Sequence, residues 1–185
     1  MNTMNPGVTH LRTLSREELI TLIDIHAKSW LAHDGAWFLA AEAACGMDTA
    51  IALDTRACEI FTAVEAKRIM RTFKIPHNGG LDALEKALRF RLYATVNPQT
   101  LERPDENTLI FKMIECRVQN ARRRKGLPDF ACKPVGIVEY TKFAEAVDSR
   151  ITTRCLRCPP DDAEGAGCIC GWEFTIKDPG ETGRD

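Results

Sequence analysis

Apolar residues recur at three- and four-residue steps through the first half of the chain, which is typical of amphipathic helices. Ser15 followed by Glu18 forms a capping box, so we expect a helix that begins just after Ser15 and ends near Gly46. A second helix is expected at residues 48–73 and a third at residues 81–93. The expected inner face of the first helix carries Leu19, Leu22, Ile23, His26, Trp30, His33 and Trp37.

The pattern changes after Tyr93, where alternating apolar and polar residues replace the helical spacing. Helices followed by a mostly antiparallel sheet with one further helix define the α+β class. The sequence predicts strands at residues 108–118, 151–156 and 169–176, and a helix at residues 135–147. We expect one compact domain at residues 13–176, made of a helical part at 13–95 and an α+β part with a metal site at 96–176. Flexible tails are expected on either side of it, at residues 1–12 and 177–185.

Composition and charge exclude several classes of protein. The formal net charge is -1, which argues against nucleic acid as a partner. No apolar run approaches the roughly 20 residues that a membrane-spanning helix needs. The first twelve residues lack the apolar core of a secretory signal, so we expect a soluble protein in the cytoplasm, where thiols stay reduced. The sequence is compatible with a homo-oligomer.

The cysteines therefore need a role other than disulfide bonds. Cys45 and Cys58 fall in helical patterns and are expected as small core residues, whereas the other six of the eight cysteines lie between residues 116 and 170. Two thiolates in a C-x-x-C knuckle chelate one ion from a tight turn, and two more soft ligands complete a tetrahedral site. A redox dithiol and buried inert thiols are the alternatives. The predicted metal ligands are Cys132, Cys155, Cys158 and Cys170, for zinc or alternatively an iron–sulfur cluster, and Cys116 or Cys168 stays open as a further ligand.

Two further groups are candidates for chemistry. His33 and Trp37 are one helical turn apart, so His33 is a candidate catalytic base and Trp37 a candidate apolar wall if that face lines a cavity. The alternative is a histidine and a tryptophan that belong to the core. A basic run that includes Arg117 and Arg124 precedes a loop at Pro128; it is a candidate clamp for a carboxylate or phosphate, or else a solvated turn.

These residues also carry a resemblance. The chain resembles a bacterial and archaeal family of cytosolic proteins of unknown function over nearly its whole length after the first dozen residues. The motifs are His33-Asp34-Gly35-x-Trp37-Phe38, Leu88 to Ala94, Cys116-Arg117-Val118-Gln119-x-Ala121-Arg122-x-Arg124-Lys125-Gly126-Leu127, Cys132-Lys133-Pro134-Val135-Gly136, Cys155-x-x-Cys158-Pro159-Pro160-Asp161, and Cys170-x-Trp172-x-Phe174.

Two more distant resemblances bear on function. The order Cys132, residue 155, Cys158, Cys170 is similar to the zinc site of 4-vinyl-reductase-type domains, which sense small aromatic molecules in some bacterial regulators. Those domains have an acidic residue where this chain has Cys155. The chain is similar, more distantly still, to hydrolases that open a 2-aminothiazoline-4-carboxylate ring, but none of their catalytic residues has a counterpart that we could place here.

The sequence thus favours a zinc-stabilised domain that binds a small molecule, either an organic acid or an aromatic compound. The alternative is a hydrolase that acts on a small cyclic amidine or amide, with zinc-bound water or His33 as base. Four thiolates would close the coordination shell of zinc, which argues for a structural ion and against catalysis by bound water. Whether the protein is an enzyme stays open at this point.

Overall fold

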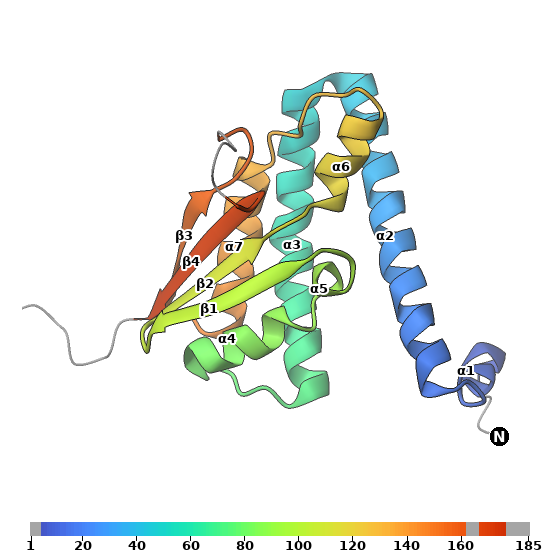
Figure 1. Ribbon diagram of the computed structural model, residues 1–185, viewed down its shortest axis with the longest axis vertical. Helices are drawn as coiled ribbons and strands as arrows, with labels where there is room; N and C mark the ends of the chain where they lie inside the picture. Colours follow the sequence, from blue (N-terminus) through green and yellow to red (C-terminus); the bar gives the residue numbers. More distant parts are fainter. Residues whose placement is uncertain (1–4, 162–166, 177–185) are drawn as a thin grey trace, which may run out of the picture.

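The computed structural model describes residues 5–161 and 167–176, within which the chain forms seven helices and four strands. Figure 1 shows the sheet along one side of the molecule, α7 and α3 beside it, and α2 on the opposite side. The predicted α+β class is confirmed. The elements are α1 (Pro6–Leu11), α2 (Arg16–Cys45), α3 (Met47–Phe73), α4 (Gly80–Leu88), α5 (Leu92–Val96), β1 (Gln99–Asp105), β2 (Thr108–Met113), α6 (Arg117–Arg124), α7 (Lys133–Val147), β3 (Ile151–Arg157) and β4 (Cys170–Ile176).

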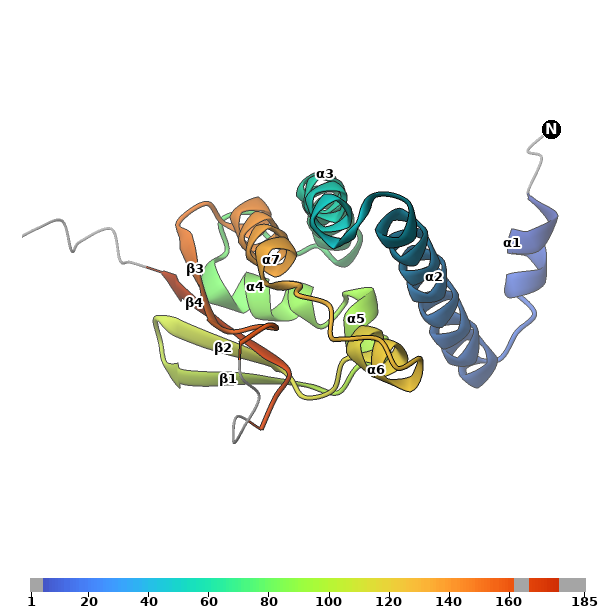
Figure 2. The same cartoon turned by 90° about the horizontal axis from the view of Figure 1, so that it is seen from above.

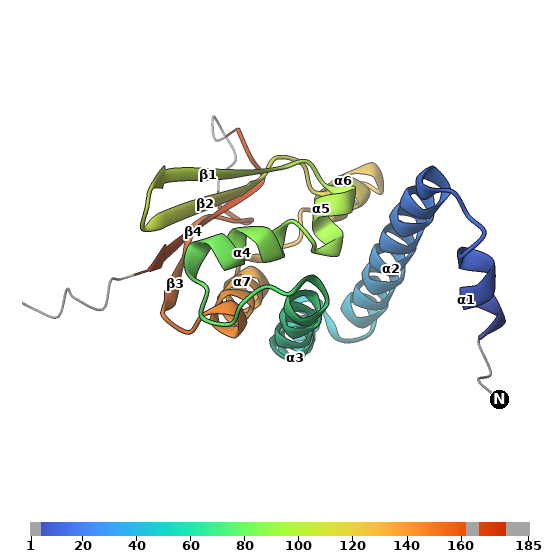
Figure 3. The same cartoon turned by 90° about the horizontal axis from the view of Figure 1, so that it is seen from below.

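The four strands form one antiparallel sheet in the order β1-β2-β4-β3. Along β2, Leu109, Phe111 and Met113 are buried while the residues between them are only partly covered, so the sheet turns one face to the core. Helices α4 and α7 lie on that face, and α3 runs alongside α7 on its outer side (Figure 2). The view from below shows the same order, from the sheet through α4 to α3 (Figure 3).

The core lies between the sheet and α7 and is filled with aromatic rings. Trp172 of β4 is fully buried and stacks on Tyr140 of α7, with the ring centroids 4.6 Å apart. The helix approaches the strand closely because residue 136 is glycine: a Cβ there would lie 2.7 Å from Cζ2 of Trp172. The buried side chains around this contact include Leu84, Leu88, Leu109, Phe111, Phe143, Val147 and Phe174.

Helix α2 is held differently. Its N-terminus has the predicted capping box, in which Ser15 and Glu18 each bond to the backbone of the other, and it ends at Gly46, whose φ of 81° starts the turn into α3. Only Ala27 and Leu31 are buried along its length. The predicted inner face was wrong at Ile23 and Trp37, which are exposed, whereas Trp30 stacks on Phe61 of α3 with the ring centroids 5.3 Å apart. None of the helices in the described ranges combines the length and apolar character needed to cross a membrane.

Other local predictions were confirmed or corrected. The helices expected at 48–73 and 135–147 and the strands expected at 151–156 and 169–176 are present within a few residues as α3, α7, β3 and β4. The strand expected at 108–118 ends at residue 113, and the basic run, expected as a clamp or a solvated turn, forms the end of α6. The helix expected at 81–93 is divided into α4 and α5, and β1 was not predicted.

Two further corrections concern the first helix pair and the chain termini. Cys45, expected in the core, is exposed, and Cys58 is half-buried. Residues 6–11 of the expected N-terminal tail form α1, whereas residues 1–4 and the expected tail at 177–185 lie outside the described residues.

Candidate ligand cavity and cysteine cluster

A cavity of about 680 Å³ lies between α2 and the end of the sheet. Helices α3, α5, α6 and α7 contribute to its walls, so it is formed by segments far apart in the sequence. Its size falls within the roughly 300–1,000 Å³ of small-molecule sites. Most of its wall is apolar or aromatic, with Trp30, Leu31, Phe38, Leu39, Phe61, Tyr93, Met113, Val118, Phe130, Val135, Tyr140 and Trp172.

The wall on the side of α6 is held by directed polar contacts. Arg122 forms two hydrogen-bonded contacts with the carboxylate of Glu42 on α2, at 2.6 and 3.0 Å, and donates from Nε to the carbonyl of Pro128 at 2.7 Å. The side-chain amide of Gln119 donates a hydrogen bond to the carbonyl of Phe130 at 2.8 Å and accepts one from the N–H of Phe130 at 2.9 Å. These contacts fix α6 and the loop after it against α2, and so close one side of the cavity.

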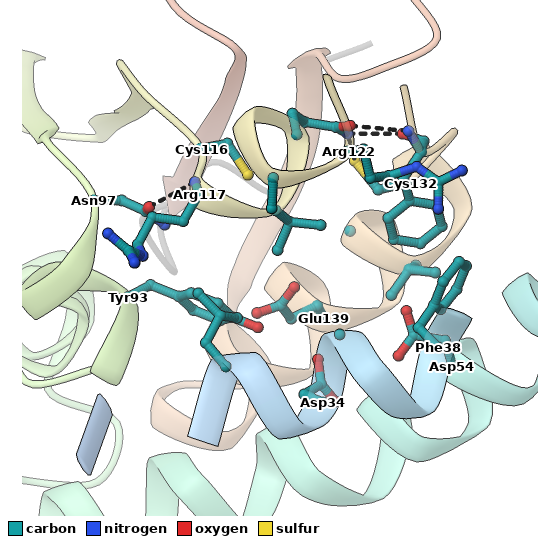
Figure 4. A pocket seen from close by; sticks show the side chains of 18 of the residues that line it. Asp34, Phe38, Asp54, Tyr93, Asn97, Cys116, Arg117, Arg122, Cys132 and Glu139 are labelled. Atoms are coloured by element: carbon teal, nitrogen blue, oxygen red, sulfur yellow. Dashed lines mark hydrogen bonds between the residues drawn. The ribbon is translucent and has the colours of Figure 1, made fainter. Parts of the chain in front are cut away.

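Three carboxylates lie at the opposite wall. They belong to Asp34 of α2, Asp54 of α3 and Glu139 of α7. Figure 4 shows the carboxylates of Asp34 and Glu139 and the hydroxyl of Tyr93 directed toward the same space. Burial, and then the charge of Glu139, raise the pKa of Asp34 above its usual value. Burial, and then the charges of Asp34 and Glu139, raise the pKa of Asp54 to about 6.

Glu139 has a strong counter-charge, whereas no ion pair to Asp34 or Asp54 occurs among the described residues. Arg91 is almost fully buried, and its guanidinium donates to Glu139 at 2.6 Å and to Glu65 at 2.9 Å. The same guanidinium lies 4.7 to 5.5 Å from the ring centroids of Tyr93, Tyr140 and Phe143. Arg91 therefore fixes the position of Glu139 and joins α3, α5 and α7 behind the cavity.

The structure places the predicted binding residues unequally. Arg117 and Arg124 line the cavity, and the backbone N–H of Arg117 donates a hydrogen bond of 3.0 Å to the side-chain oxygen of Asn97. Trp37 is 68 % exposed and is absent from the cavity wall formed by the described residues. His33 is likewise exposed and outside that wall. The helical face was misjudged by one position, because the cavity is lined by their neighbours Asp34 and Phe38.

Three of the predicted cysteine ligands meet beside the cavity. Cys132 precedes α7, Cys158 follows β3 and Cys170 begins β4. The sulfur atoms of Cys132 and Cys158 are 3.5 Å apart, and the thiol of Cys158 also interacts with Cys170. Hydrogen bonding to both neighbours raises the pKa of Cys158, while the hydrogen bond from Cys158 lowers the pKa of Cys132.

The remaining cysteines have separate positions. Cys155 lies on β3 opposite Trp172 and packs against the core, but it is absent from the cavity wall. Cys116 lines the cavity just before α6, and the carbonyl of Cys168 accepts a hydrogen bond from Arg157. Within residues 5–161 and 167–176, no group of three or more His, Cys, Asp or Glu side chains is arranged to hold a metal ion.

This geometry defines an α+β domain with a mostly apolar cavity between its helices and the end of the sheet. The chain matches a family of unknown function, DUF6125, over residues 12–176, and it belongs to that family. The expectation of an uncharacterised family is thus confirmed. No curated protein matches the chain.

One solved structure resembles this fold. It is the phenol-responsive sensory domain of the transcription activator PoxR, in a crystal structure with phenol. The two chains superimpose with a TM-score of 0.51 at 20 % sequence identity, and the match covers 78 % of this chain and 73 % of that one. At this identity the comparison establishes a likeness of fold.

Proposed function

We propose that this chain is a small-molecule-binding domain whose ligand occupies the cavity between α2, α6, α7 and the sheet. The cavity carries this proposal: it encloses about 680 Å³ with a largely apolar wall and a few charged groups, the composition that ligand sites share. The likeness of fold to a domain that responds to phenol supports it. A cavity of this kind inside a domain otherwise packed with aromatic rings needs an explanation other than loose packing.

The wall favours an aromatic ligand. Trp30, Phe38 and Tyr93 lie in this wall, and rings prefer offset or edge-to-face contacts with other rings. An organic acid is the second ligand class that the sequence predicted, with Arg117 and Arg124 as its anchors. Both arginines lie at the cavity. An organic acid would therefore bind with its carboxylate beside α6.

A structural zinc ion stays part of the proposal. Its ligands would be Cys132, Cys155, Cys158 and Cys170, and the ion would join the start of α7 to β3 and β4. The adjacent sulfur atoms of Cys132 and Cys158 support this donor set, since thiolates suit zinc. An iron–sulfur cluster at the same thiols is the alternative cofactor. The hydrolase alternative has less support, because His33, its candidate base, lies outside the cavity wall formed by the described residues.

Gly35 offers a test of where the ligand binds. It lies in the wall of the cavity within α2, and a Cβ at this position would meet no atom within 4 Å. Gly35→Phe therefore fills part of the cavity, whereas Gly35→Ala adds one methyl group and favours the helix by roughly 1 kcal/mol. The two variants differ mainly in the volume that they occupy.

The experiment is a titration of tryptophan fluorescence and melting temperature with phenol, 4-hydroxybenzoate and related small aromatics. We expect saturable binding to the parent protein, an affinity at least about tenfold lower for Gly35→Phe, and little change for Gly35→Ala. Trp37→Phe, which alters an exposed ring outside the cavity, is the control for the fluorescence signal. Absence of binding by every compound, or equal binding by Gly35→Phe, would contradict the proposal.

A further inference from the structure

The carboxylate wall of the cavity has more negative charge than the described residues neutralise. Asp34 and Asp54 come from α2 and α3, face the cavity and have no ion-pair partner among the residues that the structure describes. Asp54 accepts only a weak contact from the thiol of Cys58, at 3.8 Å. A half-buried carboxylate without a counter-charge costs free energy, and a cation placed beside it would recover that cost.

Of the nearby basic side chains, the exposed His33 acts on Asp34 through its charge, as the last of the causes that set the pKa of Asp34, and the others are engaged elsewhere. Arg91 binds Glu65 and Glu139, Lys28 binds Asp24 at 2.6 Å, and Arg122 binds Glu42. The other cations of the wall, Arg117, Arg124 and Lys125, all belong to α6 or directly follow it. Figure 4 shows Arg117 beside Asn97, away from Asp34. The cavity is therefore polarised, with acidic groups toward α2 and α3 and basic groups toward α6.

An independent feature of the wall also indicates a ligand. Trp172 lines the cavity, its side chain is fully buried, and its indole N–H has no hydrogen-bond partner among the described residues. A buried donor without an acceptor is rare and costs free energy comparable to a lost hydrogen bond. An oxygen atom supplied by a ligand would satisfy it.

We propose that the ligand is a small aromatic compound with a protonated amine, bound by Asp34 and Asp54, and with an oxygen acceptor for the indole N–H of Trp172. This inference rests on the proposed function and names the ligand class of the same cavity. The aromatic wall binds the ring, and the two aspartates distinguish a cation from a neutral or anionic compound of the same shape.

The protonation of Asp54 adds a pH dependence to this selectivity. The groups that face Asp54 are Asp34 from α2, Glu139 from α7 and Cys58 of its own helix, and both acidic neighbours make it harder to ionise. Because the pKa of Asp54 is about 6, its carboxylate is charged at pH 7.5 and becomes neutral as the pH falls below 6. The affinity for an amine should fall over that range, while the affinity for a neutral analogue should not.

The test compares three probes of nearly equal shape: 4-hydroxybenzylamine, 4-hydroxybenzyl alcohol and 4-hydroxybenzoate. Each carries the hydroxyl that Trp172 requires, and only the charge of the other group differs. Calorimetric titration of the full chain at pH 7.5 should rank the amine at least about tenfold above the alcohol and the benzoate. If the alcohol or the benzoate binds as tightly as the amine, the amine inference is overturned and the proposed function stands. If none of the three binds, both fail.

Variants of the two aspartates test whether these residues cause the selectivity for the amine. Asp54→Asn and Asp34→Asn keep the side-chain shape and should each reduce amine binding about tenfold while alcohol binding changes little. The matched control is Glu59→Gln, which removes one charge from an exposed position on the same helix as Asp54. Equal amine affinity in both aspartate variants and the control would overturn the inference. The ranking of the three probes on the parent protein decides the question even for a variant that fails to fold.

Discussion

Helices α7 and α2 both flank the space next to the sheet, but they are held there by different means. The fifteen residues of α7 bury six side chains or glycines, whereas the thirty residues of α2 bury only Ala27 and Leu31. The contacts of α7 are aromatic stacking and close packing around Gly136. The contacts of α2 are fewer for its length: Trp30 stacks on Phe61 of α3, Phe38 packs on Phe130, and Glu42 pairs with Arg122.

This difference shows how one small domain combines a rigid part with a cavity. Apolar burial of the kind found at α7 supplies most of the folding free energy of a domain. At α2, two ring pairs and one ion pair join the helix to its neighbours without filling all the space between them. The cavity therefore lies where close packing gives way to a few separate contacts.

The largest expected effect tests whether the stability of the domain lies on the α7 side. Phe143→Ala removes a fully buried ring of α7 and should lower the free energy of unfolding by about 3–5 kcal/mol. Leu31→Ala removes a buried residue of α2 that already borders the cavity, so it should cost less than about 2 kcal/mol. Chemical denaturation of both variants measures the difference. Equal losses would show that α2 is packed as tightly as α7.

The second prediction concerns the cysteines at the start of α7. If they hold zinc, Cys158→Ser should remove the ion and lower the free energy of unfolding by roughly 3 kcal/mol, because metal binding is coupled to folding. Cys45→Ser, at an exposed position on α2, should change neither. Elemental analysis measures the metal content, and melting temperatures with and without a chelator measure the stability that the ion contributes. A parent protein without metal, with a melting temperature unchanged by the chelator, would refute the zinc site.

The ion pair of α2 gives the third prediction. Arg122→Gln removes the two contacts with Glu42 and the one with Pro128, so it should lower the free energy of unfolding by about 2 kcal/mol and increase hydrogen exchange in α2 more than in α7. Arg123→Gln is the matched control, since it breaks an exposed pair with Asp129 and should cost less than about 1 kcal/mol. Equal exchange in both helices would show that the pair does not position α2.

The smallest effect is present at neutral pH and disappears in acid. Asp148 is buried at the end of α7. The guanidinium of Arg150 and the backbone N–H groups of Arg150 and Gly80 donate hydrogen bonds to its carboxylate, and they lower its pKa from 3.8 to about 2. A carboxylate with a depressed pKa stabilises the fold above its unfolded pKa, and this contribution is lost as the pH falls from about 4 to 2. Asp148→Asn should remove up to about 2 kcal/mol of this acid-dependent stability. Parallel pH profiles for parent and variant would contradict this.

The sequence predicted elements well where a local signal marks them. Ser15 with Glu18 and the glycine at 46 set the ends of α2, and alternation along β3 and β4 is local as well. The buried face of α2 was not predictable, because apolar residues occur all around this helix and periodicity then selects no side. Helix α6 was missed because four consecutive basic residues, 122–125, lack any apolar pattern; only contacts with α2 and the loop at residue 128 fix its conformation.

The candidate site was only partly predictable for a related reason. The C-x-x-C knuckle and the basic run are local patterns, and they indicated Cys155, Cys158 and the arginines of α6. Asp54 and Glu139, by contrast, resemble ordinary surface residues of helices in the sequence. Their place in a cavity follows from the tertiary arrangement of α2, α3 and α7, which no local pattern encodes.

The turn at Gly46 gives α2 the mechanical properties of a lever. The helix is about 45 Å long, and it is joined to α3 through a single residue with a positive φ, so its far end is distant from its pivot. A rotation of about 5° at that pivot would displace the start of α2, together with α1, by about 4 Å. A change of a few tenths of an ångström in the cavity near Phe38 would thus become a larger displacement at the N-terminal end of α2.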